Sequence, residues 1–80
     1  MKIQVLFFGI TTDLTGKNST FFELDSNTTV WDLKQQLIAK FSKLQHLHEF
    51  AIAVNEEYAT DDLNLIDSDV VAIIPPVSGG

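Results

Sequence analysis

The last six residues, Pro75-Pro76-Val77-Ser78-Gly79-Gly80, combine residue types that suit a chain end to insertion into a narrow site. The prolines cannot donate to a sheet ladder and hold the backbone near polyproline II geometry, so they end a strand and stiffen the base of the tail. The glycines lack a β-carbon, so the backbone passes where a larger residue would clash. Six extended residues project about 20 Å. We therefore expect the Gly80 carboxylate to be the reactive group, with Gly79 keeping the tip slim.

Other side chains offer weaker chemistry. His46, His48 and Glu49 could ligate a metal ion, but two histidines at this spacing often share a loop by chance, so we expect no metal site. Ser78 has no His or Lys near it in sequence to act as a base, which argues against a serine nucleophile. The chain contains no cysteine, which excludes a disulfide scaffold and a thiol nucleophile.

The charge distribution favours a protein partner. Five lysines and eleven acidic residues give a net charge of −6, and there is no arginine. All five lysines lie at or before Lys43, and the acids beyond it include the pairs Glu56–Glu57 and Asp61–Asp62, which we interpret as a solvated face. Binding to nucleic acid or to an anionic membrane needs Lys and Arg, so both are disfavoured, whereas a protein with a basic face is favoured. No signal peptide or membrane span is evident, and we expect a cytoplasmic protein.

The order of elements predicts an α+β fold: a mixed sheet with one long helix packed on one face. Alternating or apolar runs predict four strands, at Lys2–Phe8, Ser19–Leu24, Phe50–Asn55 and Asp69–Ile74. Residues 9–18 are expected to form a loop with at most one helical turn. The first and last strands are the most apolar, so we expect them to be central and paired. We therefore divide the chain into a domain, residues 1–74, and a tail, residues 75–80.

The predicted helix begins at Val30 and runs for about four turns. Thr29 is a suitable N-cap, and Asp32 three residues later completes a capping box. Apolar residues then recur at helical spacing, and we expect them to face the core: Val30, Leu33, Leu37, Phe41 and Leu44, with Trp31 and Ile38 widening the stripe. In the segment before the last strand, we expect three apolar residues to be buried, namely Leu63, Leu65 and Ile66.

Strand parity predicts an apolar patch on the open face of the sheet. If Lys2 faces solvent, Leu6 and Phe8 face the same way, and Ile74 joins them if the first and last strands are neighbours. Tyr58 could reach this patch. An exposed apolar patch beside the root of the tail favours an interface, and the alternative is that a loop covers Phe8.

The chain resembles, over nearly its full length, the small subunits of molybdopterin synthase, a family of ubiquitin-like sulfur carriers. The resemblance rests on VLFFG at residues 5–9, AVN at 53–55 and LIDSDVVAIIPPVSGG at 65–80. Terminal Gly-Gly occurs in many ubiquitin-like carriers, but the ending Pro-Pro-Val-Ser/Thr-Gly-Gly is typical of the molybdopterin branch. The implied fold is the β-grasp, in agreement with the predicted order of elements.

The resemblance also implies a mechanism. An adenylating enzyme related to ubiquitin-activating enzymes uses ATP to convert the Gly80 carboxylate to an acyl adenylate, and a sulfur donor protein displaces AMP to leave a thiocarboxylate. The large synthase subunit, in a heterotetramer, then takes this sulfur for cyclic pyranopterin monophosphate, and two carriers build the dithiolene of molybdopterin. The chain would thus be the sulfur-donating subunit of an enzyme whose other catalytic groups lie on the large subunit. No cofactor is expected to stay bound to it.

Partner-binding positions are also implied by the resemblance. Phe8, Tyr58 and Ile74 match hydrophobic contact positions of the family, the same residues that strand parity places on the open face. Four residues of the tail would line the partner's channel: Pro75, Pro76, Val77 and Ser78.

Two positions depart from the family pattern. Thr12 stands where many members carry an arginine, which puts one polar partner contact in doubt. Asp67-Ser68-Asp69 replaces the usual Asp-Gly-Asp or Gly-Gly-Asp, a change in a turn.

Three alternative functions remain open from the sequence. The chain could be a modifier joined through Gly80 to lysines of other proteins, because that chemistry diverges only after adenylation. It could be a sulfur carrier for thiamine thiazole, although such carriers usually lack the Pro-Pro-Val approach. It could also be a pure interaction domain, in which case removal of Gly79 and Gly80 would leave function intact.

Overall fold

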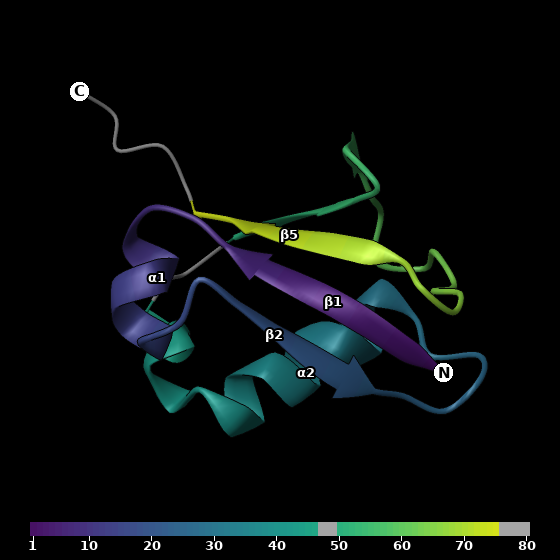
Figure 1. Cartoon of the computed structure of the whole chain (residues 1–80), viewed down its shortest axis with the longest axis horizontal. Helices are drawn as coiled ribbons and strands as arrows, with labels where there is room; N and C mark the ends of the chain where they lie inside the picture. Colours follow the sequence, from purple (N-terminus) through teal and green to yellow (C-terminus); the bar gives the residue numbers. More distant parts are fainter. Residues whose placement is uncertain (47–49, 76–80) are drawn as a thin grey trace.

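The computed structural model describes residues 1–46 and 50–75, which form a five-stranded sheet with helices on one side (Figure 1). The elements in chain order are β1 Lys2–Phe7, α1 Ile10–Thr15, β2 Ser19–Glu23, α2 Val30–Lys40, the 3₁₀ helix η1 Ser42–His46, β3 Ala51–Val54, β4 Glu57–Tyr58 and β5 Val70–Ile74.

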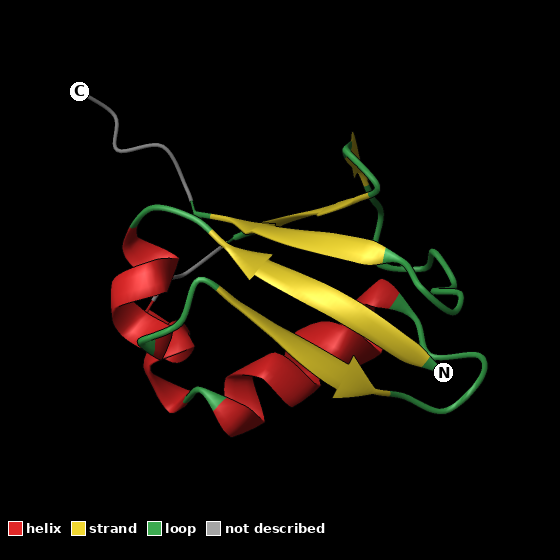
Figure 2. Cartoon of the chain, viewed as in Figure 1, coloured by secondary structure: helices red, strands yellow, loops and turns green. Residues whose placement is uncertain are grey.

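The sheet has the strand order β2-β1-β5-β3-β4, so the first and last strands lie side by side near its middle (Figure 2). β1 and β5 are parallel, with Val5 opposite Val71 and Phe7 opposite Ile73. The neighbouring pairs β1–β2 and β3–β5 are antiparallel, which makes the sheet mixed. The predicted pairing of the first and last strands is confirmed, and β5, the strand that precedes the predicted tail, lies at the centre of the sheet.

The hydrophobic core lies between the sheet and α2, which crosses the far side of the sheet in Figure 1. Alternate residues of the central strands face it, so Ile3, Val5 and Phe7 are buried while their neighbours are more exposed. The helix contributes Val30, Leu33 and Leu37, which are fully buried. This confirms the predicted face of the sheet.

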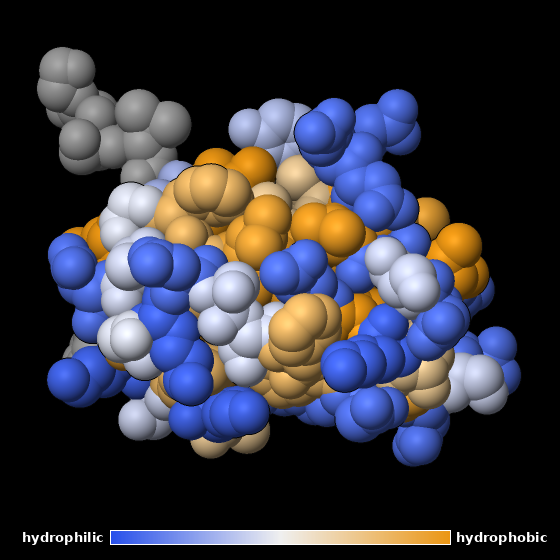
Figure 3. Space-filling view, viewed as in Figure 1, coloured by the Kyte–Doolittle hydropathy of each residue, from blue (hydrophilic) through white to orange (hydrophobic). Residues whose placement is uncertain are grey.

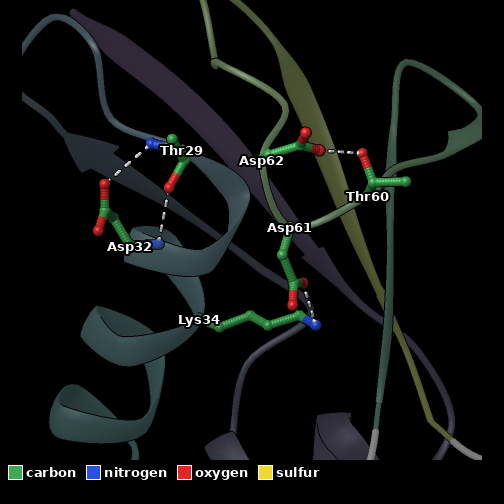
Figure 4. A network of polar contacts seen from close by, with 6 residues as sticks. All are labelled: Thr29, Asp32, Lys34, Thr60, Asp61 and Asp62. Atoms are coloured by element: carbon green, nitrogen blue, oxygen red, sulfur yellow. Dashed lines mark hydrogen bonds and ion pairs between the residues drawn. The ribbon is translucent and has the colours of Figure 1, made fainter.

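The start of α2 agrees with the sequence prediction in detail. The Asp32 backbone N–H donates to Thr29 Oγ1 over 3.2 Å, and the Thr29 backbone N–H donates to Asp32 Oδ2 over 3.1 Å (Figure 4). Each group satisfies a donor that the first turn of a helix leaves unpaired. A Lys34–Asp61 ion pair of 2.8 Å, also drawn in Figure 4, ties the helix to the segment that precedes β5.

Two details of the predicted helix are wrong. It ends at Lys40 because Phe41 leaves the helical region, with φ −119° and ψ 79°, so the buried side chain of Leu44 comes from η1 rather than from a fourth turn. Trp31 does not widen the buried stripe, since 52% of it is exposed. At the first turn of α2 the buried face is already filled by Val30 and Leu33, and Trp31 points away from it.

The segment between β4 and β5 also differs from expectation. Leu65 is buried, as predicted, but 42% of Leu63 and 65% of Ile66 are exposed. Backbone bonds set this arrangement: the Leu63 carbonyl accepts from the Val30 N–H, and the Leu65 N–H donates to the Thr28 carbonyl. The segment is therefore held against the start of α2 by its main chain, and only Leu65 enters the core.

Candidate functional site: the tail root and the open face of the sheet

The predicted tail begins directly after β5, a central strand with a neighbour on each side. Ile74 is the last strand residue, and Pro75, without an N–H, cannot continue the ladder. Residues 76–80 lie outside the described part of the chain. The roles assigned to Pro76, Val77, Ser78, Gly79 and Gly80 therefore stay predictions.

The turn after β1 packs against the root of the tail. Gly9 has φ +56°, a backbone conformation that favours glycine, and a β-carbon added there would lie 3.3 Å from Pro75 Cγ. The buried Thr11 side chain fixes this turn, because its hydroxyl accepts from the Phe8 N–H over 2.9 Å and donates to the Phe8 carbonyl. The turn therefore holds Phe8 and supports Pro75 together, a link that the sequence prediction missed.

Thr12, where the resemblance implies an arginine in many members, follows this turn in the first turn of α1. Its hydroxyl donates to the Phe7 carbonyl over 3.2 Å, so the side chain bonds within the chain itself. It adds to the support of the turn.

The open face of the sheet carries an apolar patch, as strand parity predicts. Register places Leu6 opposite Ala72, Ala72 opposite Ala53, and Ala53 opposite Tyr58, a row across four strands. The next row toward the tail pairs Ile74 with Ala51. Figure 3 shows this hydrophobic surface over β1 and β5, between more hydrophilic regions.

The three predicted contact residues differ in exposure and spacing. Phe8 is 50% exposed, so no described residue covers it fully, and Tyr58 is 76% exposed, whereas Ile74 is partly buried. Phe8 and Ile74 come directly after the paired residues Phe7 and Ile73 and so extend adjacent strands at the tail root. Tyr58 is two strands from Ile74 and one row away, about 12 Å by strand and residue spacings. A partner that touches all three must cover much of the open face.

Hydrogen bonds of the Asn55 and Asp69 side chains, here called the clasp, fix the turn that precedes β5. Asp69 is 5% exposed, and its carboxylate accepts from the Asn55 side-chain amide over 2.9 Å and from the Ile66 N–H over 2.8 Å. The Asn55 side-chain carbonyl accepts from the Val70 N–H over 3.0 Å. Asn55 and Asp69 belong to the sequence segments on which the family resemblance rests, and the clasp supplies a structural reason for both residue types.

Asp67 ties the same turn to the start of β1. The Lys2 backbone N–H donates to Asp67 Oδ1 over 2.8 Å. This bond favours the ionised carboxylate and so lowers the pKa of Asp67, with a smaller contribution from the Ser68 hydroxyl. Ser68 itself has φ +71°, so the turn retains the left-handed backbone that suits the glycine of the usual family pattern.

The metal-ligand candidates His46, His48 and Glu49 fall mostly outside the described residues. His48 and Glu49 lie outside the described residues, and His46 ends η1. Among residues 1–46 and 50–75, no three His, Cys, Asp or Glu residues come together as metal ligands. The four residues of the two acidic pairs are exposed, as the interpretation of a solvated face expects; Asp61 forms an ion pair with Lys34, and Asp62 accepts from Thr60 over 2.6 Å. Within the described part of the chain, no helix is long and apolar enough to cross a membrane.

Comparison with known proteins shows the family of this chain. The ThiS family model matches residues 5–80. The chain is 40% identical to a molybdopterin synthase sulfur carrier subunit of Chlamydomonas reinhardtii over the whole of both chains. It is 36% identical to that of Arabidopsis thaliana, covering all of this chain and 84% of the relative.

Solved structures give the same answer for the fold. A putative molybdopterin converting factor subunit 1 from Pyrococcus furiosus has a TM-score of 0.86 at 29% identity, over 95% of this chain and 98% of its own. The complex of molybdopterin-converting factor subunits 1 and 2 from Helicobacter pylori contains a chain with TM-score 0.72 at 29% identity, with full coverage of both. The ubiquitin of Caldiarchaeum subterraneum, at 19% identity and TM-score 0.68, shares the fold, covering all of this chain and 98% of its own. The fold is thus the ubiquitin-like β-grasp, and the chain belongs to the ThiS family.

Proposed function

We propose that this chain is the sulfur carrier subunit of a molybdopterin synthase. The observation that carries the proposal is the sequence Pro-Pro-Val-Ser-Gly-Gly directly after the central strand of a β-grasp fold. Full-length similarity to sulfur carrier subunits supports it. The carrier would work in the cytoplasm.

The reaction begins at Gly80. Its carboxylate attacks the α-phosphate of ATP on an adenylating enzyme, which forms the acyl adenylate and releases pyrophosphate. A sulfur donor protein then supplies sulfur at the oxidation level of sulfide; a carbon–sulfur bond forms, AMP leaves, and Gly80 becomes a thiocarboxylate. These two partners belong to the proposal through the family resemblance.

The second half-reaction takes place on the large subunit. The loaded tail would enter its active site, where the sulfur bonds to a carbon of cyclic pyranopterin monophosphate and an oxygen substituent leaves that carbon. Water then cleaves the acyl–sulfur bond and restores the Gly80 carboxylate. Since a dithiolene holds two sulfur atoms, two carriers discharge for each molybdopterin, consistent with a heterotetramer. The chain supplies no cluster of basic residues for the pterin phosphate, so that task belongs to the large subunit.

The domain contributes position rather than acid–base chemistry. β5 is paired with a strand on each side and so fixes the point where the tail begins. The Gly9 turn packs against Pro75, the first residue of the tail. The exposed Phe8 and Tyr58 provide apolar surface on the open face. Buried aromatic residues often dominate the binding energy of an interface, so this patch is where we expect the large subunit to dock.

The test is the intact mass of the chain after incubation with its cognate adenylating enzyme, ATP and a sulfur donor. We expect one oxygen to be replaced by sulfur, with the change mapping to Gly80. A variant that lacks Gly79 and Gly80 should fold and bind the large subunit but accept no sulfur and form no molybdopterin. If Gly80 remains a carboxylate while the same enzyme loads another carrier, the proposal fails.

The modifier alternative makes a different prediction for the same adenylated Gly80. It requires conjugates between Gly80 and lysines of other proteins that survive boiling and reductant. Abundant conjugates without molybdopterin formation would replace the sulfur carrier function with that one.

A further inference from the structure

A second apolar surface lies at the edge of the sheet formed by β4. Tyr58, Leu63 and Ile66 line an open groove of about 410 Å³ between β4 and the segment before β5. Its floor includes the buried Val54 and Asp69. Leu63 and Ile66 are large apolar side chains held out of the core by main-chain bonds, although the sequence pattern predicts their burial.

The rim of this groove is acidic. Glu57 lines it, and the exposed Asp62 accepts a hydrogen bond from Thr60, which also lines it. Glu56 and Asp61 are exposed acids next in sequence to lining residues. Within residues 1–46 and 50–75, the Lys34–Asp61 ion pair is the one salt bridge to these acids. Figure 3 shows hydrophilic residues at the upper right of the molecule, where the short strand β4 lies in Figure 2. Apolar side chains within a negative rim match a partner segment that carries an apolar residue flanked by Lys or Arg.

Tyr58 connects the groove to the open face of the sheet. It lines the groove, and it also ends the row Leu6–Ala72–Ala53–Tyr58 on the open face. A protein that covers the patch at the tail root and reaches Tyr58 therefore arrives directly at the groove. A complex of two subunits is among the solved structures similar to this chain, so the large subunit is the partner to which we assign the contact.

We propose that the groove of Tyr58, Leu63 and Ile66 docks a basic segment of the large synthase subunit, in which Lys or Arg flanks an apolar side chain. This inference rests on the proposed function. The groove would act as a second anchor, separate from the tail and from Phe8 and Ile74. Its apolar residues would slow dissociation, and its acidic rim would speed association at low salt.

The experiment measures association and dissociation of the purified cognate large subunit with the full chain. The double variant Leu63→Thr/Ile66→Thr should raise Kd about tenfold or more, mainly through faster dissociation. The control Phe21→Thr removes an equally exposed apolar side chain (57%) from β2, at the opposite edge of the sheet, and should stay within about twofold of wild type. Circular dichroism and thermal unfolding confirm that each variant is folded.

A second pair of variants tests the charge. Glu57→Gln/Asp62→Asn should lower the association rate about three- to tenfold at low salt and flatten its salt dependence. The control Glu23→Gln/Asp25→Asn removes two exposed acids at and just after the end of β2, the edge strand opposite β4, and should leave the association rate and its salt dependence nearly unchanged.

The outcomes separate this inference from the function on which it rests. If the wild-type chain binds the large subunit and Leu63→Thr/Ile66→Thr binds equally well, the groove proposal is wrong and the proposed function stands. If wild type is loaded with sulfur but neither binds the large subunit nor yields molybdopterin, the proposed function itself fails. If the double variant loses only self-association in sedimentation experiments, a second copy occupies the groove and the assignment is overturned.

Discussion

Replacing Ser68 by glycine should stabilise the protein, because Ser68 holds a left-handed backbone with φ +71°. A residue with a β-carbon costs about 1–2 kcal/mol in this region, which glycine avoids. Glycine's greater freedom in the unfolded chain offsets about 0.4–1 kcal/mol of that gain. Losing the exposed 3.3 Å contact from the Ser68 hydroxyl to Asp67 removes about 0.3 kcal/mol more. The net expectation is a gain of about 0.5 kcal/mol, a rise in Tm of about 2–4 °C for a chain of this size.

The matched control is Ser26→Gly. Ser26 is exposed in a turn, and its φ is not positive, so glycine brings no relief there and should cost about 0.4–1 kcal/mol. Urea unfolding of wild type and both variants measures their free energies of unfolding. Ser68→Gly should raise this free energy and Ser26→Gly should lower it, so that the two variants differ by about 1 kcal/mol. If Ser68→Gly destabilises the protein as much as Ser26→Gly does, the left-handed turn is not a source of strain and the reasoning is refuted.

Three further predictions concern the polar contacts that shape the domain. In Asp69→Asn, an NH2 group replaces one of the two carboxylate oxygens that accept from Asn55 and from the Ile66 N–H, so one of these donors loses its acceptor. The free energy of unfolding should fall by about 1–3 kcal/mol in urea titrations, and an unchanged midpoint would contradict the clasp. The lowered pKa of Asp67 means that its bond to the Lys2 N–H adds stability above the unfolded-state pKa, and that this stability is lost as pH falls through the folded-state pKa; Asp67→Asn should flatten the acid limb of a stability–pH curve, and carboxyl NMR should show the low pKa directly. Thr29→Ala removes the N-cap that pairs with Asp32 and should cost about 1 kcal/mol by thermal unfolding, whereas a cost near zero would mean that water replaces the cap.

Local sequence signals predicted the start of α2 and the faces of the strands. Thr29 and Asp32 lie three residues apart, which is all that a capping box requires, and the alternation from Lys2 to Phe8 needs only the period of a strand. The exposure of Phe8 results from the same alternation. Short-range patterns of this kind depend on backbone geometry that neighbouring residues already determine.

Errors arose where distant main-chain bonds decide the outcome. Leu63 and Ile66 look like core residues in sequence, yet the segment is held to the start of α2 by its backbone and its side chains turn outward. The short strand β4 likewise depends on pairing with β3, and Phe41, where the helix ends, packs its ring edge-on against Phe7 of β1. The Gly9–Pro75 contact joins residues from opposite ends of the chain, and no local pattern indicates it.

The sequence by itself determined the residue types on which the proposed chemistry rests: Pro-Pro and Gly-Gly within residues 75–80, after an acidic chain without arginine or cysteine. These are properties of residue types in order, and they hold before any contact forms. Only the tertiary structure decided how the tail is supported and which surfaces surround it. Strand order places β5 between β1 and β3, and the packing of remote segments leaves the groove at Tyr58 open. Such contacts join residues far apart in the chain, so they exist only once the whole sheet has formed.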